Sequence, residues 1–339
     1  MTWYETWMKE RMAKGAEANK EFYAAPSTKA IAPFRIADDL YYVGDQKVCA
    51  HLIRTDEGLI LIDAGYPEAK HLLWESIIRL GFDPADVRWL ILTHGHSDHY
   101  GELSMMLRNY DENSNFKINN IYFDFPDFVN SNFDPDDYTV EKLDLMKELF
   151  DKYAKVNDLG VENYYNALNG AVVNANSVAN GLTMEIDGVK LEILQTWCEE
   201  DDQVNGNSMV IRVRPENPNG KTCLFLNDVS IVSGARLLKT YGEQLKSDVV
   251  QMSHHGQAGA DKDVYDMIDA KIRLWPTPFW VWGNEETYKI GEVRGWVGVD
   301  ADNLTENDLV ACEYKAYPED YTSVDDWKQC VQGMKILLD

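Results

Sequence analysis

The sequence predicts a layered α/β fold with mixed β-sheets. Short apolar runs bounded by turn residues alternate with amphipathic segments over the first hundred residues, and the same alternation resumes after residue 180. Strands that alternate with helices build sheets whose faces the helices cover. Of the 339 residues 45% are hydrophobic, which is enough for a sizeable core.

In the first half the expected order is strand, strand, strand, helix, strand. The strands are expected at 39–43, 48–54, 58–63 and 87–92, and the helix at about 68–80, ending at Gly81. Beyond them the pattern predicts a helix over 100–108, a strand near 118–123 and a helix over about 140–156. Residues 3–20 have helical spacing and a polar face of mixed charge, which favours a helix packed on the domain over a membrane anchor.

In the second half the strand pattern returns. The strands are expected at 182–186, 189–194, 208–213, 222–226, 248–252 and 271–274, and the helices at 235–241 and 262–268. The tail from about Pro276 is aromatic and irregular, and no element is assigned to it.

Composition limits the partners. The chain has 57 acidic and 32 basic residues, a formal charge of −25, which argues against a long nucleic acid and leaves a small-molecule substrate or a short nucleotide ligand. The five cysteines form no CxxC pair, which fits reduced, buried thiols in a cytoplasmic protein. No secretory leader and no apolar run of membrane-spanning length is recognised, so no membrane association is expected. No oligomeric state is predicted.

Five of the seven histidines fall in two clusters, His94-Gly95-His96-Ser97-Asp98-His99 and Ser253-His254-His255-Gly256. Each cluster follows an expected buried strand, where functional loops commonly lie. Imidazole with carboxylate suits Zn²⁺ best, with Mn²⁺ or Fe²⁺ as alternatives. Packing is a poor explanation, because burying these groups unpaired would cost several kcal/mol. His51 and His71 are interpreted as ordinary core or surface residues.

The first cluster, preceded by Leu61-Ile62-Asp63-Ala64-Gly65, resembles the metallo-β-lactamase superfamily. The segments Asn207–Val210, Leu224–Asp228 and Asp248–Gly256 resemble the branch that contains the metal-dependent domain of bacterial DNA-uptake channel proteins. The resemblance implies an αββα sandwich, two mixed β-sheets flanked by helices.

The same resemblance suggests a domain organisation. It covers about 34–275, with a poorly matching insertion at about 101–180. Residues 1–33 would then be an N-terminal helical extension. Residues 276–339 would be a C-terminal aromatic and acidic extension packed on the domain.

The resemblance also implies roles for individual residues. One or two metal ions are implied, of which His94 and His96 would hold the first and Asp98, His99 and His254 the second. Asp228 would bridge the two ions, and Asp63 would orient the histidine loop. His255 is either the alternative to His254 or a residue that faces the substrate. Asp98 is also expected to accept a hydrogen bond from the nucleophile and relay its proton.

The pattern departs from the family at one ligand. Most members supply a third histidine to the first metal, yet no histidine lies between His99 and His254. Cys198 or Glu199 could replace it chemically, as could Asn207 or water, while Cys198 as a merely buried thiol is an equal alternative. The first metal is therefore expected to bind weakly or to be absent.

The predicted function is a metal-dependent hydrolase in which a metal-bound hydroxide attacks a small ester, lactone, thioester or phosphodiester. The alternatives are a mononuclear-iron redox enzyme of the same fold and a degenerate metal-binding protein without catalysis. The aromatic segment Trp275–Trp282 either walls the substrate pocket or, the favoured interpretation, packs over the sheet edge.

Overall fold

The computed structural model describes residues 18, 20–24, 26–66, 69–94, 97–100, 120–123, 155–157, 163–168, 171–177, 180–196, 205–215 and 217–314. Within them two sheets form, of nine strands in the order β1-β2-β3-β4-β5-β6-β9-β8-β7 and of seven strands in the order β10 to β16. The strands of the first sheet are β1 Phe34–Ala37, β2 Leu40–Tyr42, β3 His51–Arg54, β4 Leu59–Ile62, β5 Val87–Ile91, β6 Asn120–Phe123, β7 Lys155–Asn157, β8 Asn163–Leu168 and β9 Ala171–Ser177. Those of the second are β10 Thr183–Ile186, β11 Val189–Gln195, β12 Val210–Arg214, β13 Cys223–Phe225, β14 Val249–Gln251, β15 Ile272–Trp275 and β16 Asp308–Val310.

Helices complete the described chain. The α-helices are α2 Lys70–Arg79, α3 Ser97–Tyr100, α6 Ile231–Tyr241, α7 Lys262–Ile268, α8 Phe279–Trp282, α9 Glu285–Tyr288 and α10 Ile290–Val297. The 3₁₀ turns are η1 Pro26–Lys29, η3 Pro84–Asp86, η4 Asn205–Asn207, η5 Gly242–Leu245, η6 Ser253–Gly256 and η7 Ala311–Tyr314. None of the helices among these residues is long and apolar enough to cross a membrane.

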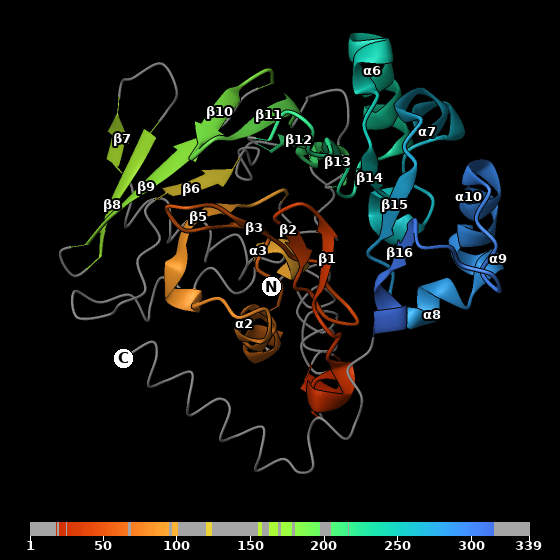
Figure 1. Cartoon of the computed structure of the whole chain (residues 1–339), viewed down its shortest axis with the longest axis horizontal. Coiled ribbons are helices and arrows are strands. Elements are labelled where there is room, and N and C mark those ends of the chain that lie inside the picture. Colours follow the sequence, from red (N-terminus) through yellow and green to blue (C-terminus); the bar gives the residue numbers. More distant parts are fainter. Residues whose placement is uncertain are drawn as a thin grey trace, which may run out of the picture.

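The elements stack in four layers, which confirms the predicted αββα sandwich with two mixed sheets. In Figure 1, α2 lies on the outside of the first sheet, and α6, α7 and α10 lie on the outside of the second. Both sheets are mixed, since β4, β5 and β6 run parallel beside antiparallel β1 to β4, and β13 to β16 run parallel beside antiparallel β10 to β13.

The main core lies between the two sheets. Ile62 and Ile91 of the first sheet belong to the same buried cluster as Ile211 and Phe225 of the second. A second cluster joins the outer face of the second sheet to its helices, with Leu237 of α6 among its members. Every residue of β4 is buried, as expected for a parallel strand covered on both faces.

Most expected elements are confirmed with small changes of boundary, and α6 shows the cause of one. It begins at Ile231, four residues before the predicted start, because Ser230 and Ser233 form a capping box in which each side chain binds the other residue's backbone N–H. The capping residues are serines, and the apolar periodicity used for the prediction begins only after them.

Two predictions differ from the structure. The helix predicted over about 140–156 is wrong at its last two residues, which begin strand β7, and its earlier part lies outside the described residues. The tail from Pro276 to residue 314, the last one described, forms regular elements rather than an irregular segment. It contains α8, α9, α10 and the edge strand β16, which pairs in parallel with β15. The helix over 100–108 and most of the helix over 3–20 also fall outside the described residues.

The topology brings three distant loops to one edge of the sandwich. The loops after β5, β13 and β14 all leave the carboxyl ends of parallel strands, and β13 and β14 are direct neighbours. Loops at such an edge are a common place for a functional site.

Candidate metal centre

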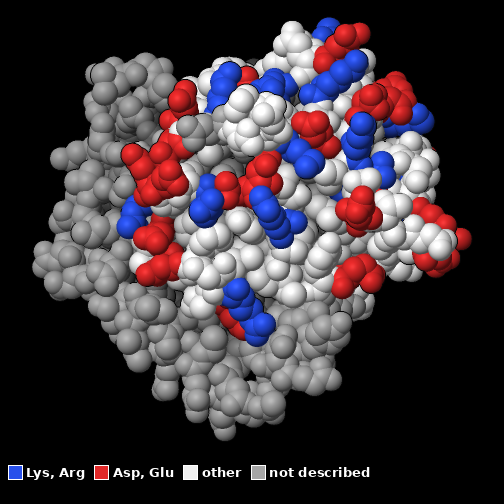
Figure 2. Space-filling model, viewed as in Figure 1, with Lys and Arg blue, Asp and Glu red and all other residues white. Residues whose placement is uncertain are grey.

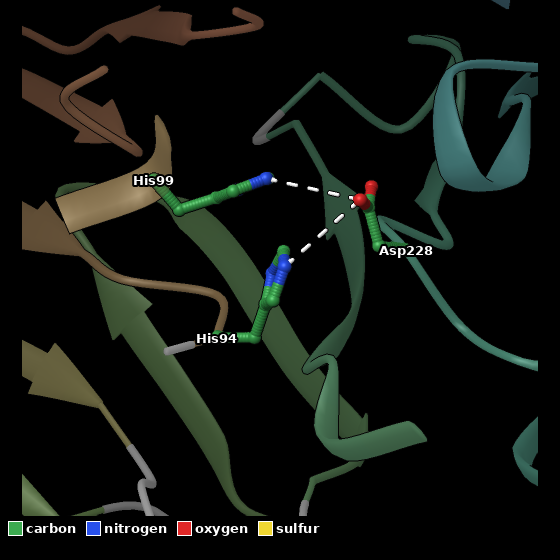
Figure 3. A group of neighbouring side chains, drawn as sticks. All are labelled: His94, His99 and Asp228. Carbon is green, nitrogen blue, oxygen red and sulfur yellow. Dashed lines mark ion pairs between the residues drawn. The ribbon is translucent and has the colours of Figure 1, made fainter. Parts of the chain in front are cut away.

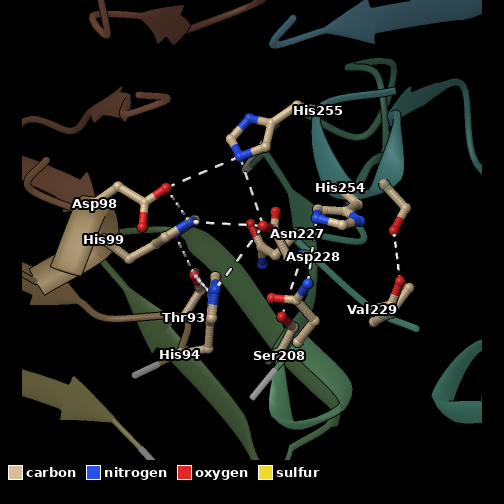
Figure 4. A network of polar contacts seen from close by, with 12 residues as sticks. Thr93, His94, Asp98, His99, Ser208, Asn227, Asp228, Val229, His254 and His255 are labelled. Carbon is tan, nitrogen blue, oxygen red and sulfur yellow. Dashed lines mark hydrogen bonds and ion pairs between the residues drawn. The ribbon is translucent and has the colours of Figure 1, made fainter. Parts of the chain in front are cut away.

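Three histidine side chains converge on one carboxylate (Figure 4), and Figure 3 shows two of them, His94 and His99, beside Asp228. The Nε2 atoms of His94, His99 and His255 lie 3.9, 4.0 and 3.5 Å from Asp228 Oδ2. His94 follows β5, His99 lies on α3, Asp228 follows β13 and His255 lies in η6. All four residues are buried. Loops from both sheets therefore supply one cluster.

Asp98 extends this cluster toward solvent. Its Oδ2 atom lies 3.7 Å from His99 Nε2 and 4.0 Å from His255 Nε2 (Figure 4). Two sets of side chains thus have ligand atoms within 4.8 Å of one another, His94 with His99 and Asp228, and Asp98 with His99 and His255. Each set could hold a cation, and the two sets share His99.

Asp63 orients this cluster from beneath. Its Oδ2 atom accepts hydrogen bonds from His99 Nδ1 at 2.7 Å and from Thr93 Oγ1 at 2.8 Å, and its Oδ1 atom accepts from Thr93 N at 2.9 Å. With Nδ1 carrying the hydrogen, the lone pair of His99 is on Nε2, which faces Asp228. Burial would lower the pKa of His99, but the charges of Asp63 and Asp98 outweigh it and raise the pKa to about 10, so a metal ion that binds Nε2 would displace a proton from it.

The His255 ring is oriented toward the cluster by a contact with Pro276 and by the left-handed backbone of His255 itself. Its Nδ1 atom lies 3.1 Å from the carbonyl oxygen of Pro276, which leaves Nε2 to face Asp228. Its φ of 58° is in the left-handed region. Thr277 Oγ1 donates to the His255 carbonyl at 2.6 Å and fixes this turn from the other side.

His254 points elsewhere. Its Nδ1 atom lies 3.1 Å from the carbonyl oxygen of Ala258, and its Nε2 atom lies 3.2 Å from Asn205 Nδ2. One tautomer satisfies both contacts, with Nδ1 donating and Nε2 accepting. Both ring nitrogens are thereby used. The geometry favours His255, the alternative of the sequence analysis, over His254 as the ligand.

Asp228 is positioned by residues that the sequence analysis did not identify. Its backbone N–H donates to Ser208 Oγ at 3.2 Å. The preceding residue, Asn227, has a φ of 50°, and its N–H donates to Gln251 Oε1 at 2.6 Å. The only local signal for Ser208, Asn227 and Gln251 is a polar residue at a buried strand end, and their partners are distant in sequence.

The residues present fit a cation. His99 Nε2 and Asp228 Oδ1 are buried with no hydrogen-bond partner among the described residues. Leaving such atoms unsatisfied costs about 1–3 kcal/mol each, so a bound ion would relieve the cost. Burial would raise the pKa of Asp228, but the charges of His255, His99 and His254 outweigh it and lower the pKa. An ionised carboxylate among imidazoles is a donor set that Zn²⁺ prefers.

Three predicted residues, His96, Cys198 and Glu199, lie outside the described residues, so the remaining ligands of the first metal stay predictions. Asn207, another suggested substitute, is buried in η4. His51 is fully buried beside the rings of Tyr42 and Phe225, in agreement with its interpretation as a core residue.

One segment of the chain matches the metallo-β-lactamase superfamily. Residues 43–114 match the family model described as "Metallo-beta-lactamase superfamily", and this segment contains Asp63 and the motif from His94 to His99. The matched segment therefore contains the N-terminal half of the candidate metal centre.

Two curated relatives match this chain over short segments. Metallo-beta-lactamase domain-containing protein 1 of Mus musculus is 36% identical over 83 residues, which are 24% of this chain and 28% of the relative. The human protein of that name is 41% identical over 56 residues, 16% of this chain and 21% of the relative. The matched segments thus span only about a fifth to a quarter of these relatives.

Solved structures with overall similarity include BJP-1, a subclass B3 metallo-β-lactamase of Bradyrhizobium japonicum. It has a TM-score of 0.44 and 16% identity, with 93% of this chain and 99% of that chain covered. The metallo-β-lactamase GOB-18 of Elizabethkingia meningoseptica has a TM-score of 0.43 and 16% identity, with 92% of each chain covered. The resemblance to the DNA-uptake branch stays a prediction.

Proposed function

We propose that this protein is a metallo-hydrolase whose metal centre is built from His94, Asp98, His99, Asp228 and His255, together with His96 of the sequence motif. One observation carries the proposal: three imidazole Nε2 atoms converge within 4.0 Å of a single buried carboxylate oxygen. Packing alone does not account for such convergence, since buried polar groups are normally hydrogen-bonded. The orphaned atoms His99 Nε2 and Asp228 Oδ1 support the same reading.

The residues divide between two cation positions. Because one imidazole nitrogen binds one ion, His99 serves a single position, and its neighbours Asp98 and His255 complete that position. His94 and His96 would form the other. Asp228 lies near ligands of both sets, which supports its role as the bridge.

When bound, Zn²⁺ supplies Lewis-acid polarisation of a substrate oxygen and lowers the pKa of an attacking water. The chain orients the ligands through Asp63 and the Pro276 carbonyl. The Asp98 side chain is 19% exposed, whereas that of Asp228 is 4% exposed. Asp98 is therefore the carboxylate that a substrate can reach, and we assign it acceptance of the proton from the attacking water.

The net charge of the protein limits the substrate class. With a formal charge of −25 the protein repels polyanions, and in Figure 2 acidic and basic residues are interspersed with no extended basic field on the face shown. A small ester, lactone, thioester or phosphodiester is the substrate we propose.

The test combines metal removal with activity. Metal content is measured on the purified protein, which is then assayed with p-nitrophenyl acetate and bis(p-nitrophenyl) phosphate before and after chelation. Chelation should abolish hydrolysis and lower the melting temperature, because the ligand atoms are then left unsatisfied. The variant His94→Ala should lose metal and activity, whereas the control His71→Ala on α2 should keep both. Zinc-loaded protein that hydrolyses neither substrate would contradict the proposal.

A further inference from the structure

At the end of the sandwich opposite the metal centre, residues of both sheets line an open cavity of about 340 Å³. Two strands fix this placement. Cys223, the first residue of β13, lines the cavity, and the same strand leads at its other end to Asp228. Arg54, the last residue of β3, also lines it, while the first residue of β3 pairs with Ile62, next to Asp63. The cavity is therefore separate from the proposed hydrolytic site.

Two hydrogen bonds between the sheets define the cavity wall. The backbone N–H of Lys221, in the turn before β13, donates to Asp38 Oδ2 of the β1–β2 turn at 2.7 Å. The backbone N–H of Glu57, in the β3–β4 turn, donates to Asp187 Oδ2 of the β10–β11 turn at 2.7 Å. Each bond joins a hairpin of one sheet to a hairpin of the other, so the two bonds help to set the distance between these hairpins.

The most buried side chains that line the cavity are apolar, and the charged side chains lie at its exposed rim. Ile53, Val189 and Val213 are buried lining residues from both sheets. The rim carries cations and carboxylates together, namely Arg35, Arg54, Lys221, Asp38, Asp39, Asp56 and Asp187. A ligand for this cavity therefore needs an apolar body and a polar end.

Only part of the rim charge is neutralised within the protein. Arg54 pairs with Asp39 at 2.8 Å. Among the described residues neither Arg35 nor Lys221 forms an ion pair, and the Arg35 guanidinium is held only by its bond to the Asp38 carbonyl. Asp56 forms no ion pair with a described residue either. Charged groups of both signs at the rim of the cavity are thus available to pair with a ligand.

We propose that this cavity binds a small zwitterion with an apolar body, an α-amino acid with an aliphatic side chain. Its carboxylate would meet Arg35 and Lys221, its ammonium group would meet Asp56 and the free oxygens of the turn aspartates, and its side chain would enter the apolar interior. A ligand with one charge would pair with rim groups of one sign only and would therefore form fewer charged hydrogen bonds than a zwitterion. The volume is at the small end of the range of ligand pockets, which suits a molecule of this size.

Titration calorimetry on the full, metal-loaded protein tests this. L-leucine is compared with 4-methylpentanoate, which lacks the ammonium group, with 3-methylbutylamine, which lacks the carboxylate, and with glycine, which lacks the side chain. Leucine should give a saturable heat, and each analogue should bind at least about tenfold more weakly, the equivalent of 1.4 kcal/mol. No leucine heat, or an analogue that binds as tightly as leucine, would overturn the proposal.

Exposed rim residues allow variants that leave the core intact. Arg35→Gln and Asp56→Asn should each weaken leucine binding by about tenfold, because each removes one charge partner. Lys239→Gln, at an exposed position of α6 outside the cavity lining, is the matched control and should bind leucine like the parent. Metal content should be equal in all four proteins, so this test is independent of the hydrolase proposal. Unchanged leucine binding in both rim variants would overturn the assignment of the site.

Discussion

The carboxylate of Asp63 and the imidazole of His99 share a hydrogen bond of 2.7 Å in a site where both side chains are buried. This bond joins the residue after β4 to the helix after β5, and it fixes which ring nitrogen of His99 faces Asp228. A carboxylate behind a histidine ligand also raises its basicity, so Asp63 acts on the proposed metal without contacting it.

Substitution of Asp63 should weaken metal binding rather than unfold the protein. In Asp63→Asn the His99 ring loses its anionic partner, and zinc affinity should fall about 10- to 100-fold. Competition with a chromophoric chelator measures the change. Asp308→Asn is a matched control, because Asp308 is a buried aspartate that binds Arg273 and Thr305 far from the histidines. Equal zinc affinity in Asp63→Asn and the parent would show that the bond has no such role.

Substitutions of His254 and His255 should have different effects on metal content. His255→Ala should lose one bound ion, since only the His255 ring faces Asp228, whereas His254→Ala should keep the full metal content. Elemental analysis of both variants after dialysis gives the answer. The reverse result would restore His254 as the ligand.

Acid should destabilise the protein through His51. Neither ring nitrogen has a hydrogen-bond partner in the described part of the chain, and burial, with a smaller contribution from His99, lowers the pKa of His51 to about 3. An unfolded histidine titrates near 6.5, so between that pH and 3 the proton binds the unfolded chain in preference. This contribution to stability is therefore complete above about pH 6.5 and is lost as the pH falls toward 3.

The variant His51→Leu removes this titration. Between pH 7 and 4.5 the parent should lose about 2–3 kcal/mol more unfolding free energy than the variant. Urea unfolding of chelator-treated parent and variant measures it and keeps metal loss out of the comparison. Parallel pH profiles for the two proteins would mean that His51 is protonated in the folded state.

Gly256, which follows His255, should tolerate no side chain. Its φ is +80°, and an added Cβ atom would lie 2.7 Å from the Trp275 ring. Gly256→Ala should cost about 1–3 kcal/mol of stability and reduce metal binding, because the turn that carries His255 must shift. Gly242→Ala is the control, since its φ is also positive but its Cβ would have no neighbour within 4 Å. Thermal unfolding and zinc titration of both variants test this, and equal effects would assign the cost to backbone strain alone.

Local patterns carried most of the fold. The apolar run of β4 and the histidine motif after β5 lie in single short segments, so their burial and their place at a strand end could be predicted without tertiary information. By contrast, β16 has three residues and forms only because β15 offers it an edge. No local pattern encodes such a strand.

The choice between His254 and His255 shows where sequence reasoning ends at the site. Both residues have left-handed backbone, with φ of 49° and 58°, so the usual alternation of side chains along an extended loop does not apply. Their directions are set by Asn205 and Pro276, partners from other loops. The ligand therefore depends on how several loops dock.

The convergence of both sheets on Asp228 also has a kinetic consequence. His94 and His99 come from one half of the chain, and Asp228 and His255 from the other, so tight coordination requires contacts between residues distant in sequence. Such contacts form slowly, because the loops between them must close first. An ion held by all four would be captured late in folding and would then slow unfolding, so metal uptake in a refolding experiment would report the moment when the two halves dock.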